Sequence, residues 1–183
     1  MGTAYKILEP HGVYFLTFQV VDWVDIFSRK LYRDIVVDSL NYCIAHKHLK
    51  VSTWVIMTNH IHAIMHSEEK NLSDIVRDFK AHTAREIFKT IDTNIESRQV
   101  WMKHVFEFNA RQHQRNEKQQ LWTHENHAVF LNPTNPQMME SRVNYIHQNP
   151  VRAGWVLEPE HYLYSSAVDY AGKKGLVDIY LFN

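Results

Sequence analysis

Apolar and aromatic residues alternate with other residues in three short stretches of the chain, which predicts three β-strands. The stretches are 13–21 (VYFLTFQVV), 51–57 (VSTWVIM) and 60–66 (HIHAIMH). In the first, alternate positions give one face of apolar and aromatic side chains: Tyr14, Leu16, Phe18 and Val20. Because only Thr58-Asn59 separates the second stretch from the third, we expect these two strands to form a hairpin.

Two longer stretches between these strands repeat apolar residues at the helical period. Ser28 can cap a helix that runs to about His48, with an inner side made of Leu31, Ile35, Val36, Leu40 and Cys43. Asn71 or Ser73 can open a second helix. Its apolar positions keep close to the helical period: Leu72, Ile75, Val76, Phe79, Ile87, Phe88 and Ile91.

The second half of the chain is less regular. The stretch 103–120 is polar and rich in His, Gln and Arg, so we expect a loop, and 121–131 can hold a further short strand. A third helix is expected from Pro136 to Asn149, because Pro150 cannot continue it. The order strand, helix, strand, strand, helix, strand predicts an α+β fold, a ferredoxin-like antiparallel sheet with helices packed on it.

Composition narrows the classes of function. The 183 residues suffice for one domain, so we expect a single domain over 1–183, with a C-terminal tail from about 157 packing on it. The glycine spacing matches no nucleotide-cradling loop, and no apolar run approaches the roughly 18 residues of a membrane helix. A single cysteine, Cys43, excludes disulfides and fits a cytoplasmic protein.

The net charge argues against a nucleic-acid partner. Lys and Arg number 20 and Asp and Glu also number 20, whereas a protein that binds phosphates is usually basic. Two arrangements would remove this objection. The basic residues can be sorted onto one face, or some of the 13 histidines can become protonated on binding.

His60-Ile61-His62 is the first candidate for chemistry. In a strand, residues i and i+2 point to the same face about 6.6 Å apart, so two imidazoles can converge on one metal ion. His66 lies on the same face but about 13 Å beyond His62, too far for one ion to bind all three without a bend. The alternative is a pair of histidines on a solvated strand face, which the spacing alone favours.

The third predicted helix carries the second candidate. Its core stripe consists of Met139, Val143 and Ile146. Arg142, Tyr145 and Asn149 form another stripe, rotated by about 100°, that presents a guanidinium, a phenol and an amide to one side. Taken alone, the tyrosine is better explained as a half-buried residue at a helix rim, and Asn149 as a helix-ending residue.

The outer face of the second predicted helix carries Arg77 and Lys80, which are i, i+3 neighbours, followed by Arg85. These residues can contact DNA phosphates, as Arg142 can. A solvated basic face is the alternative.

Four segments together resemble the REP-associated tyrosine transposases, of the single-tyrosine HUH superfamily. They are MTNHIHAIMH, FKAHTAREI, YIHQNPVRAGWV and EHYLYSSAVDYAG, and the resemblance runs from about residue 10 to residue 175. It implies that His60 and His62 are the metal-binding pair, Tyr145 the nucleophile and Asn149 a third metal ligand. It also implies an HUH-type fold, Mg²⁺ or Mn²⁺, and cleavage and rejoining of single-stranded DNA near hairpins through a 5′-phosphotyrosine.

Two other functions stay open at this point. One is a DNA-hairpin-binding protein derived from such a transposase and used without catalysis. The other is an unrelated metal hydrolase that uses His60, His62 and another His or acid, for which Tyr145 would be dispensable. The sequence also leaves open a homodimer, and whether Tyr145 serves the histidines of its own chain or those of a partner.

Overall fold

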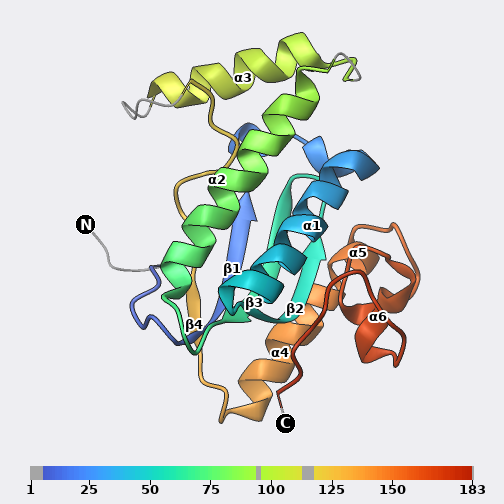
Figure 1. The fold of residues 1–183 in the computed structure, drawn as a ribbon. Helices are drawn as coiled ribbons and strands as arrows, with labels where there is room; N and C mark the ends of the chain where they lie inside the picture. Colours follow the sequence, from blue (N-terminus) through green and yellow to red (C-terminus); the bar gives the residue numbers. More distant parts are fainter. Residues whose placement is uncertain (1–5, 94–95, 113–117, 183) are drawn as a thin grey trace.

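A four-stranded antiparallel sheet forms the centre of the computed structural model, which describes residues 6–93, 96–112 and 118–182 (Figure 1). Its strands are β1 (Val13–Gln19), β2 (Lys50–Ile56), β3 (His60–His66) and β4 (Val129–Leu131). They lie in the order β2-β3-β1-β4, which is the ferredoxin-like arrangement. The predicted fold class is therefore confirmed.

The β2–β3 hairpin forms as predicted, because the short Thr58-Asn59 link brings the two strands next to each other. The Met57 N–H donates to the His60 carbonyl at 2.8 Å and closes the turn. On its other edge β3 pairs with β1, which sets Thr17 opposite His62 and Gln19 opposite His60. This register decides which β1 side chains lie beside the histidines.

Helices α1 (Lys30–Lys47) and α2 (Leu72–Ile91) cover one face of the sheet (Figure 1). Asn71 caps α2 by accepting the Ser73 N–H at 2.9 Å, so of the two predicted starts Asn71 is correct. The predicted N-cap of α1, Ser28, was one residue too early. Ser28 lies in the short helix η2 (Ile26–Ser28), which follows η1 (Val21–Trp23), and Arg29 occupies the N-cap position.

Helix α4 (Pro136–His147) packs on the opposite face and buries a smaller apolar cluster there. The predicted end at Asn149 was wrong, because the helix stops at His147. The chain turns at Gln148 and continues as α5 (Asn149–Arg152), with Pro150 in its first turn, where a missing N–H costs nothing. Later come η3 (Pro159–His161) and α6 (Ala167–Tyr170).

Helix α3 (Gln99–Gln112) corrects the prediction of a loop at 103–120. One apolar residue per turn, Met102, Phe106 and Ala110, is buried, and this narrow stripe is enough to dock a helix that is otherwise polar. Residues 113–117 of the predicted loop lie outside the described residues.

The C-terminal segment contributes side chains to the main core. Tyr164 and Val177 are buried among the residues of α1 and the sheet. The Ser166 hydroxyl accepts the Trp54 N–H at 2.9 Å, and the Tyr180 N–H donates to the Val51 carbonyl at 2.8 Å. The assignment of all 183 residues to a single domain stays a prediction. None of the helices in the described ranges is long and apolar enough to cross a membrane.

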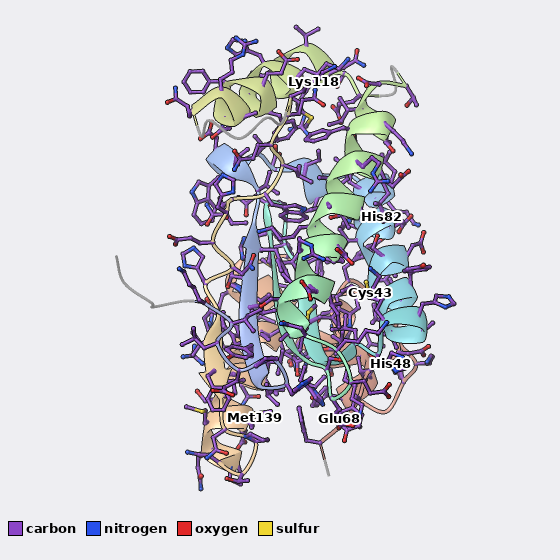
Figure 2. All side chains as sticks on the ribbon, turned by 60° about the vertical axis from the view of Figure 1, so that its left-hand side comes forward. Cys43, His48, Glu68, His82, Lys118 and Met139 are labelled. Atoms are coloured by element: carbon purple, nitrogen blue, oxygen red, sulfur yellow. The ribbon has the colours of Figure 1, made fainter. Side chains whose placement is uncertain are left out.

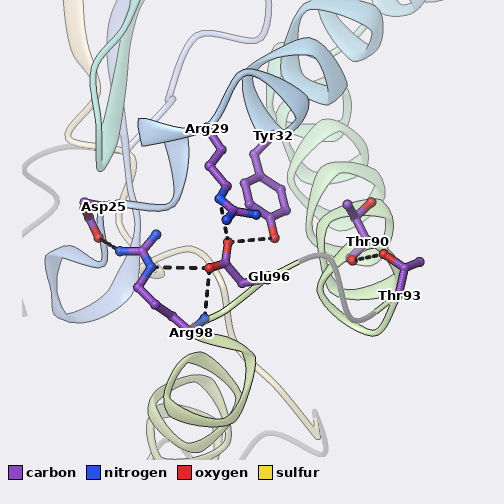
Figure 3. Close-up of polar contacts among 7 residues, drawn as sticks. All are labelled: Asp25, Arg29, Tyr32, Thr90, Thr93, Glu96 and Arg98. Atoms are coloured by element: carbon purple, nitrogen blue, oxygen red, sulfur yellow. Dashed lines mark hydrogen bonds and ion pairs between the residues drawn. The ribbon is translucent and has the colours of Figure 1, made fainter.

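A buried carboxylate ties the start of α3 to α1 (Figure 3). The Glu96 side chain is 1% exposed and pairs with Arg29 at 3.5 Å and with Arg98 at 3.4 Å. Tyr32 donates its hydroxyl to the same carboxylate at 3.3 Å, and Arg98 also pairs with Asp25 at 2.5 Å. Burial alone would raise the pKa of Glu96, but the Arg98 N–H and the two guanidinium groups offset it and lower that pKa.

We expect Glu96→Gln to lower the free energy of unfolding at pH 7 by roughly 2–3 kcal/mol, because it leaves two arginines without their buried partner. A carboxylate with a lowered pKa stabilises the fold above its unfolded pKa, near 4.3, and loses this effect as the pH falls through its folded value. The difference between wild type and variant should therefore shrink in acid.

Denaturant unfolding at several pH values measures this. The matched control is Glu86→Gln, whose carboxylate pairs with Lys89 at the surface and should contribute less than about 1 kcal/mol. Equal destabilisation of both variants would contradict a structural role for Glu96.

Candidate active site

His60 and His62 lie side by side on the face of the sheet that α4 covers. Their ring centroids are 4.7 Å apart at an interplanar angle of 69°. Ile61, between them, points to the opposite face and is fully buried in the main core. The β-strand alternation expected from the sequence therefore puts both imidazoles on one side.

Each imidazole has one nitrogen engaged by a neighbouring polar side chain. His60 Nδ1 lies 2.7 Å from the Asn59 amide oxygen, which can only accept, so Nδ1 carries the hydrogen and Nε2 keeps its lone pair. His62 Nδ1 lies 2.9 Å from the Thr17 hydroxyl, its neighbour across the β1–β3 register. Partners of this kind orient metal-binding histidines in known sites, with the other nitrogen left for the ion.

Burial favours the neutral form of both histidines. Burial lowers the pKa of His60, and burial together with the charge of His60 lowers the pKa of His62 to about 3. A neutral imidazole is the form that binds metal, so no proton has to be displaced.

Tyr145 lies next to this pair. Helix α4 brings its ring to 5.4 Å from the His62 ring and 5.9 Å from the Phe15 ring, measured between centroids. Arg142, predicted to lie on the same stripe, is close by, with its guanidinium 5.2 Å from the Phe15 ring centroid. The structure thus brings the predicted tyrosine and the predicted histidine pair together in one chain.

Arg152 is a residue of this site that the sequence reasoning missed. Its guanidinium carbon lies 5.3 Å from the centroid of the Tyr145 ring, where a cation is attracted to the π-face. The residue is seven positions after Tyr145, a spacing that would place both on one side of a continuous helix. Because the predicted helix ended at Asn149, Arg152 lay beyond it and was not placed on the side of Tyr145.

Asn149 has a structural contact that the sequence could not specify. Its amide nitrogen donates to the Tyr145 carbonyl at 2.7 Å and to the Ile146 carbonyl at 3.4 Å. In a regular helix Ile146 would receive an N–H from residue 150, and proline has none to give, so the amide replaces it. The amide nitrogen is therefore held by the helix, and the role of Asn149 as a metal ligand stays a prediction.

The donor set fits a divalent ion only if further oxygen atoms complete it. Two imidazole nitrogens and one amide oxygen leave positions for phosphate oxygens and water. In residues 6–93, 96–112 and 118–182 no three His, Cys, Asp or Glu side chains form a metal-binding group. The described residues therefore give no support to the alternative of a hydrolase with a third His or acid ligand.

His66 belongs to a different environment on the same strand. Its ring packs against Tyr180 at 5.3 Å and against Phe182 at 5.2 Å. Within the described part of the chain its buried Nδ1 has no hydrogen-bond partner. Aromatic packing at the C-terminal segment, and not the histidine pair, accounts for its position.

The predicted basic strip lines a groove of about 960 Å³ between α2 and residues 118–126. Arg77 is paired with Asp74 at 2.6 Å and Asp78 at 3.1 Å, and Lys80 donates to the Thr123 carbonyl at 2.8 Å. Arg85 of α2 also lines the groove, and Lys6 and Lys118 add basic side chains from two other segments. It lies on the α2 side of the sheet, whereas the histidines face α4. Figure 2 shows Lys118 beside α3 and Met139 of α4 at the other end of the molecule.

Comparisons with known proteins place the chain among transposases. The model of the family described as "Transposase IS200 like" matches residues 22–114. A solved REP-associated tyrosine transposase bound to a REP hairpin is similar over 100% of this chain and 96% of its own, with a TM-score of 0.60 and 16% identity. At that identity the similarity shows the fold and does not transfer residue roles.

A crystallised putative transposase from Deinococcus radiodurans R1 covers 81% of this chain and 95% of its own, with a TM-score of 0.46 and 15% identity. The search of curated proteins found no match.

We expect His62→Ala and Asn149→Ala to weaken Mn²⁺ binding at least tenfold, whereas His66→Ala leaves it unchanged, because His66 packs against aromatic rings away from the pair. Isothermal titration with Mn²⁺ measures the affinity, and circular dichroism checks that each variant is folded. A silent Asn149→Ala together with a damaging His66→Ala would show that the third ligand is not Asn149.

Proposed function

The chain belongs to the IS200-like transposase family, and on that basis we propose that it cleaves and rejoins single-stranded DNA near hairpins through Tyr145. The cut strand would be held as a covalent 5′-phosphotyrosine. His60, His62 and Asn149 would bind the assisting ion, Mg²⁺ or Mn²⁺.

The distance between Tyr145 and the histidine pair is the observation that carries this proposal. Its ring centroid is 5.4 Å from that of His62, which in turn contacts His60. A phosphate held by an ion on the two histidines would lie within reach of the phenol oxygen. A bound divalent ion would polarise the phosphate oxygens and stabilise the charge of the transition state.

The side chains around the phenol suit a nucleophile. A free tyrosine has a pKa near 10, so its ionisation needs help at neutral pH. The Arg152 guanidinium lies 5.3 Å from the centroid of the Tyr145 ring, where it can neutralise charge on a phosphate held beside the phenol. The Arg142 guanidinium lies 5.2 Å from the centroid of the Phe15 ring and can contact the DNA backbone.

The reaction balances without any further reactant. The phenolate oxygen bonds to phosphorus, the bond from phosphorus to the 3′ oxygen breaks, and that oxygen leaves as a 3′-hydroxyl once protonated. The phosphotyrosine keeps the energy of the broken bond, so a 3′-hydroxyl can attack it and restore a DNA strand. This explains why the chain needs no ATP and no phosphate-cradling loop.

The groove beside α2 suits the hairpin part of the substrate. Although the chain has zero formal net charge, the groove gathers cationic side chains from three segments. Cations concentrated in this way attract DNA phosphates and release counterions on binding. The similar structure with a bound REP hairpin supports a hairpin partner for this chain.

Replacing Tyr145 by Phe should abolish the covalent adduct, because it removes the attacking oxygen and almost no volume. Labelled single-stranded hairpin DNA, incubated with Mn²⁺ and run on a denaturing gel, shows whether protein and DNA are joined. Tyr42→Phe, at an exposed position on α1, is the matched control and should form the adduct like the wild type.

An adduct in Tyr145→Phe would move the nucleophile to another tyrosine. Binding of hairpin DNA without an adduct in any variant, wild type included, would favour the alternative of a hairpin-binding protein without catalysis.

Removing groove cations should weaken hairpin binding and reduce its salt dependence. For Arg85→Ala or Lys118→Ala we expect the slope of log K against log[salt] to fall by about 0.9 for each DNA phosphate that the variant no longer neutralises. Arg77→Ala should have a smaller effect, because two aspartates already balance its charge. Fluorescence anisotropy at several salt concentrations measures the slope, with the exposed Lys174→Ala as control. An unchanged slope in Arg85→Ala and Lys118→Ala would show that this groove does not contact the DNA phosphates.

A further inference from the structure

Trp23 is an exposed aromatic residue at the edge of the candidate active site. It ends η1, directly after β1, and 59% of its surface is exposed. Single exposed aromatic residues are common and by themselves indicate nothing. The position and the fixation of Trp23 set it apart from the exposed tryptophans elsewhere on this chain.

The backbone at Trp23 is held in an uncommon conformation. Asp22 and Trp23 have φ angles of 50° and 56°, in the left-handed region that residues with side chains rarely adopt. Such angles persist only where neighbouring contacts impose them, and they gather at functional sites. Here the Trp23 N–H donates to the Val20 carbonyl at 3.2 Å, and its carbonyl accepts the Asn59 amide at 3.3 Å.

Two residues, one in α3 and one just before it, hold this segment in place. Asn109 donates its amide to the Asp22 carboxylate at 2.7 Å. Arg98 pairs with Asp25 at 2.5 Å and also with the buried Glu96 (Figure 3). The loop that carries Trp23 is therefore fixed to two other parts of the fold.

These contacts hold the indole of Trp23 beside the histidine pair. The Trp23 ring centroid lies 6.2 Å from that of His60, at an interplanar angle of 80°. The Asn59 side chain joins the two residues, since its nitrogen donates to the Trp23 carbonyl and its oxygen accepts from His60 Nδ1. The position of Trp23 and the orientation of a candidate metal ligand thus depend on one amide.

We propose that Trp23 is a stacking platform for an unpaired base next to the scissile phosphate. This inference rests on the proposed function, which brings a single strand to His60. Unpaired bases stack on exposed aromatic side chains in single-strand binding sites, whatever their sequence. Trp23 fixes the nucleotide that follows or precedes the phosphate and so aligns the phosphate with Tyr145.

Binding without cleavage tests the platform separately from the chemistry. In the Tyr145→Phe background, Trp23→Ala should weaken binding of a 20-residue oligothymidine about tenfold, and Trp23→Phe should retain most of the affinity. Trp101→Ala, at an exposed position on α3, is the control and should bind unchanged. Equal affinity of Trp23→Ala and its parent would overturn the proposal.

Photocrosslinking locates the contact directly. Oligothymidine with 5-iododeoxyuridine at every third position should crosslink to the peptide that contains Trp23, and mass spectrometry identifies that peptide. Crosslinks confined to other peptides would overturn the platform.

The two proposals can fail separately. If the wild type forms the covalent adduct, but Trp23→Ala binds oligothymidine normally and the Trp23 peptide does not crosslink, only the stacking role of Trp23 is wrong. If Trp23 crosslinks and no adduct forms, the single-strand contact stands and cleavage by Tyr145 is wrong.

Discussion

The packing of α4 on the free face of the sheet is the constraint on which the candidate site depends. Ile146 is fully buried in the cluster with Phe15, Val55 and Ile64, so the rotation of the helix about its axis is fixed. Tyr145 precedes it by one residue and lies about 100° around the helix, which turns its ring toward β1 and β3. Without α4, His60 and His62 would be two histidines on an open strand face. With it, His62 is buried with its ring 5.4 Å from that of Tyr145, and His60 lies half-buried beside it.

Much of this arrangement could be predicted because it follows local rules. Alternation put His60 and His62 on one face, and helical spacing separated the core stripe of α4 from the stripe of Tyr145. What could not be predicted depends on tertiary contacts. Helix α3 docks through one buried residue per turn in a polar sequence. Trp23 reaches His60 through a backbone conformation that no sequence pattern signals.

The distribution of charge is compatible with the DNA binding that we propose for a chain of zero formal net charge. Of the two arrangements considered from the sequence, sorting of the basic residues is the one that the structure favours. Burial lowers the pKa of His60, His62, His66 and His147, which disfavours their protonated forms. The cations of the α2 groove are gathered instead on the face away from the histidines. Under the proposed function, the duplex part of the substrate would bind this groove and the single-stranded part would lie at the histidines.

The central claim is that one chain holds the whole site, with Tyr145 beside its own histidines. Mixing His62→Ala with Tyr145→Phe tests it, because each variant keeps what the other lacks. If Tyr145 acts on its own chain, the mixture forms no covalent DNA adduct, while wild type mixed with the double variant does. An adduct restored in the mixture would show that the tyrosine serves the histidines of a partner, and would contradict the claim.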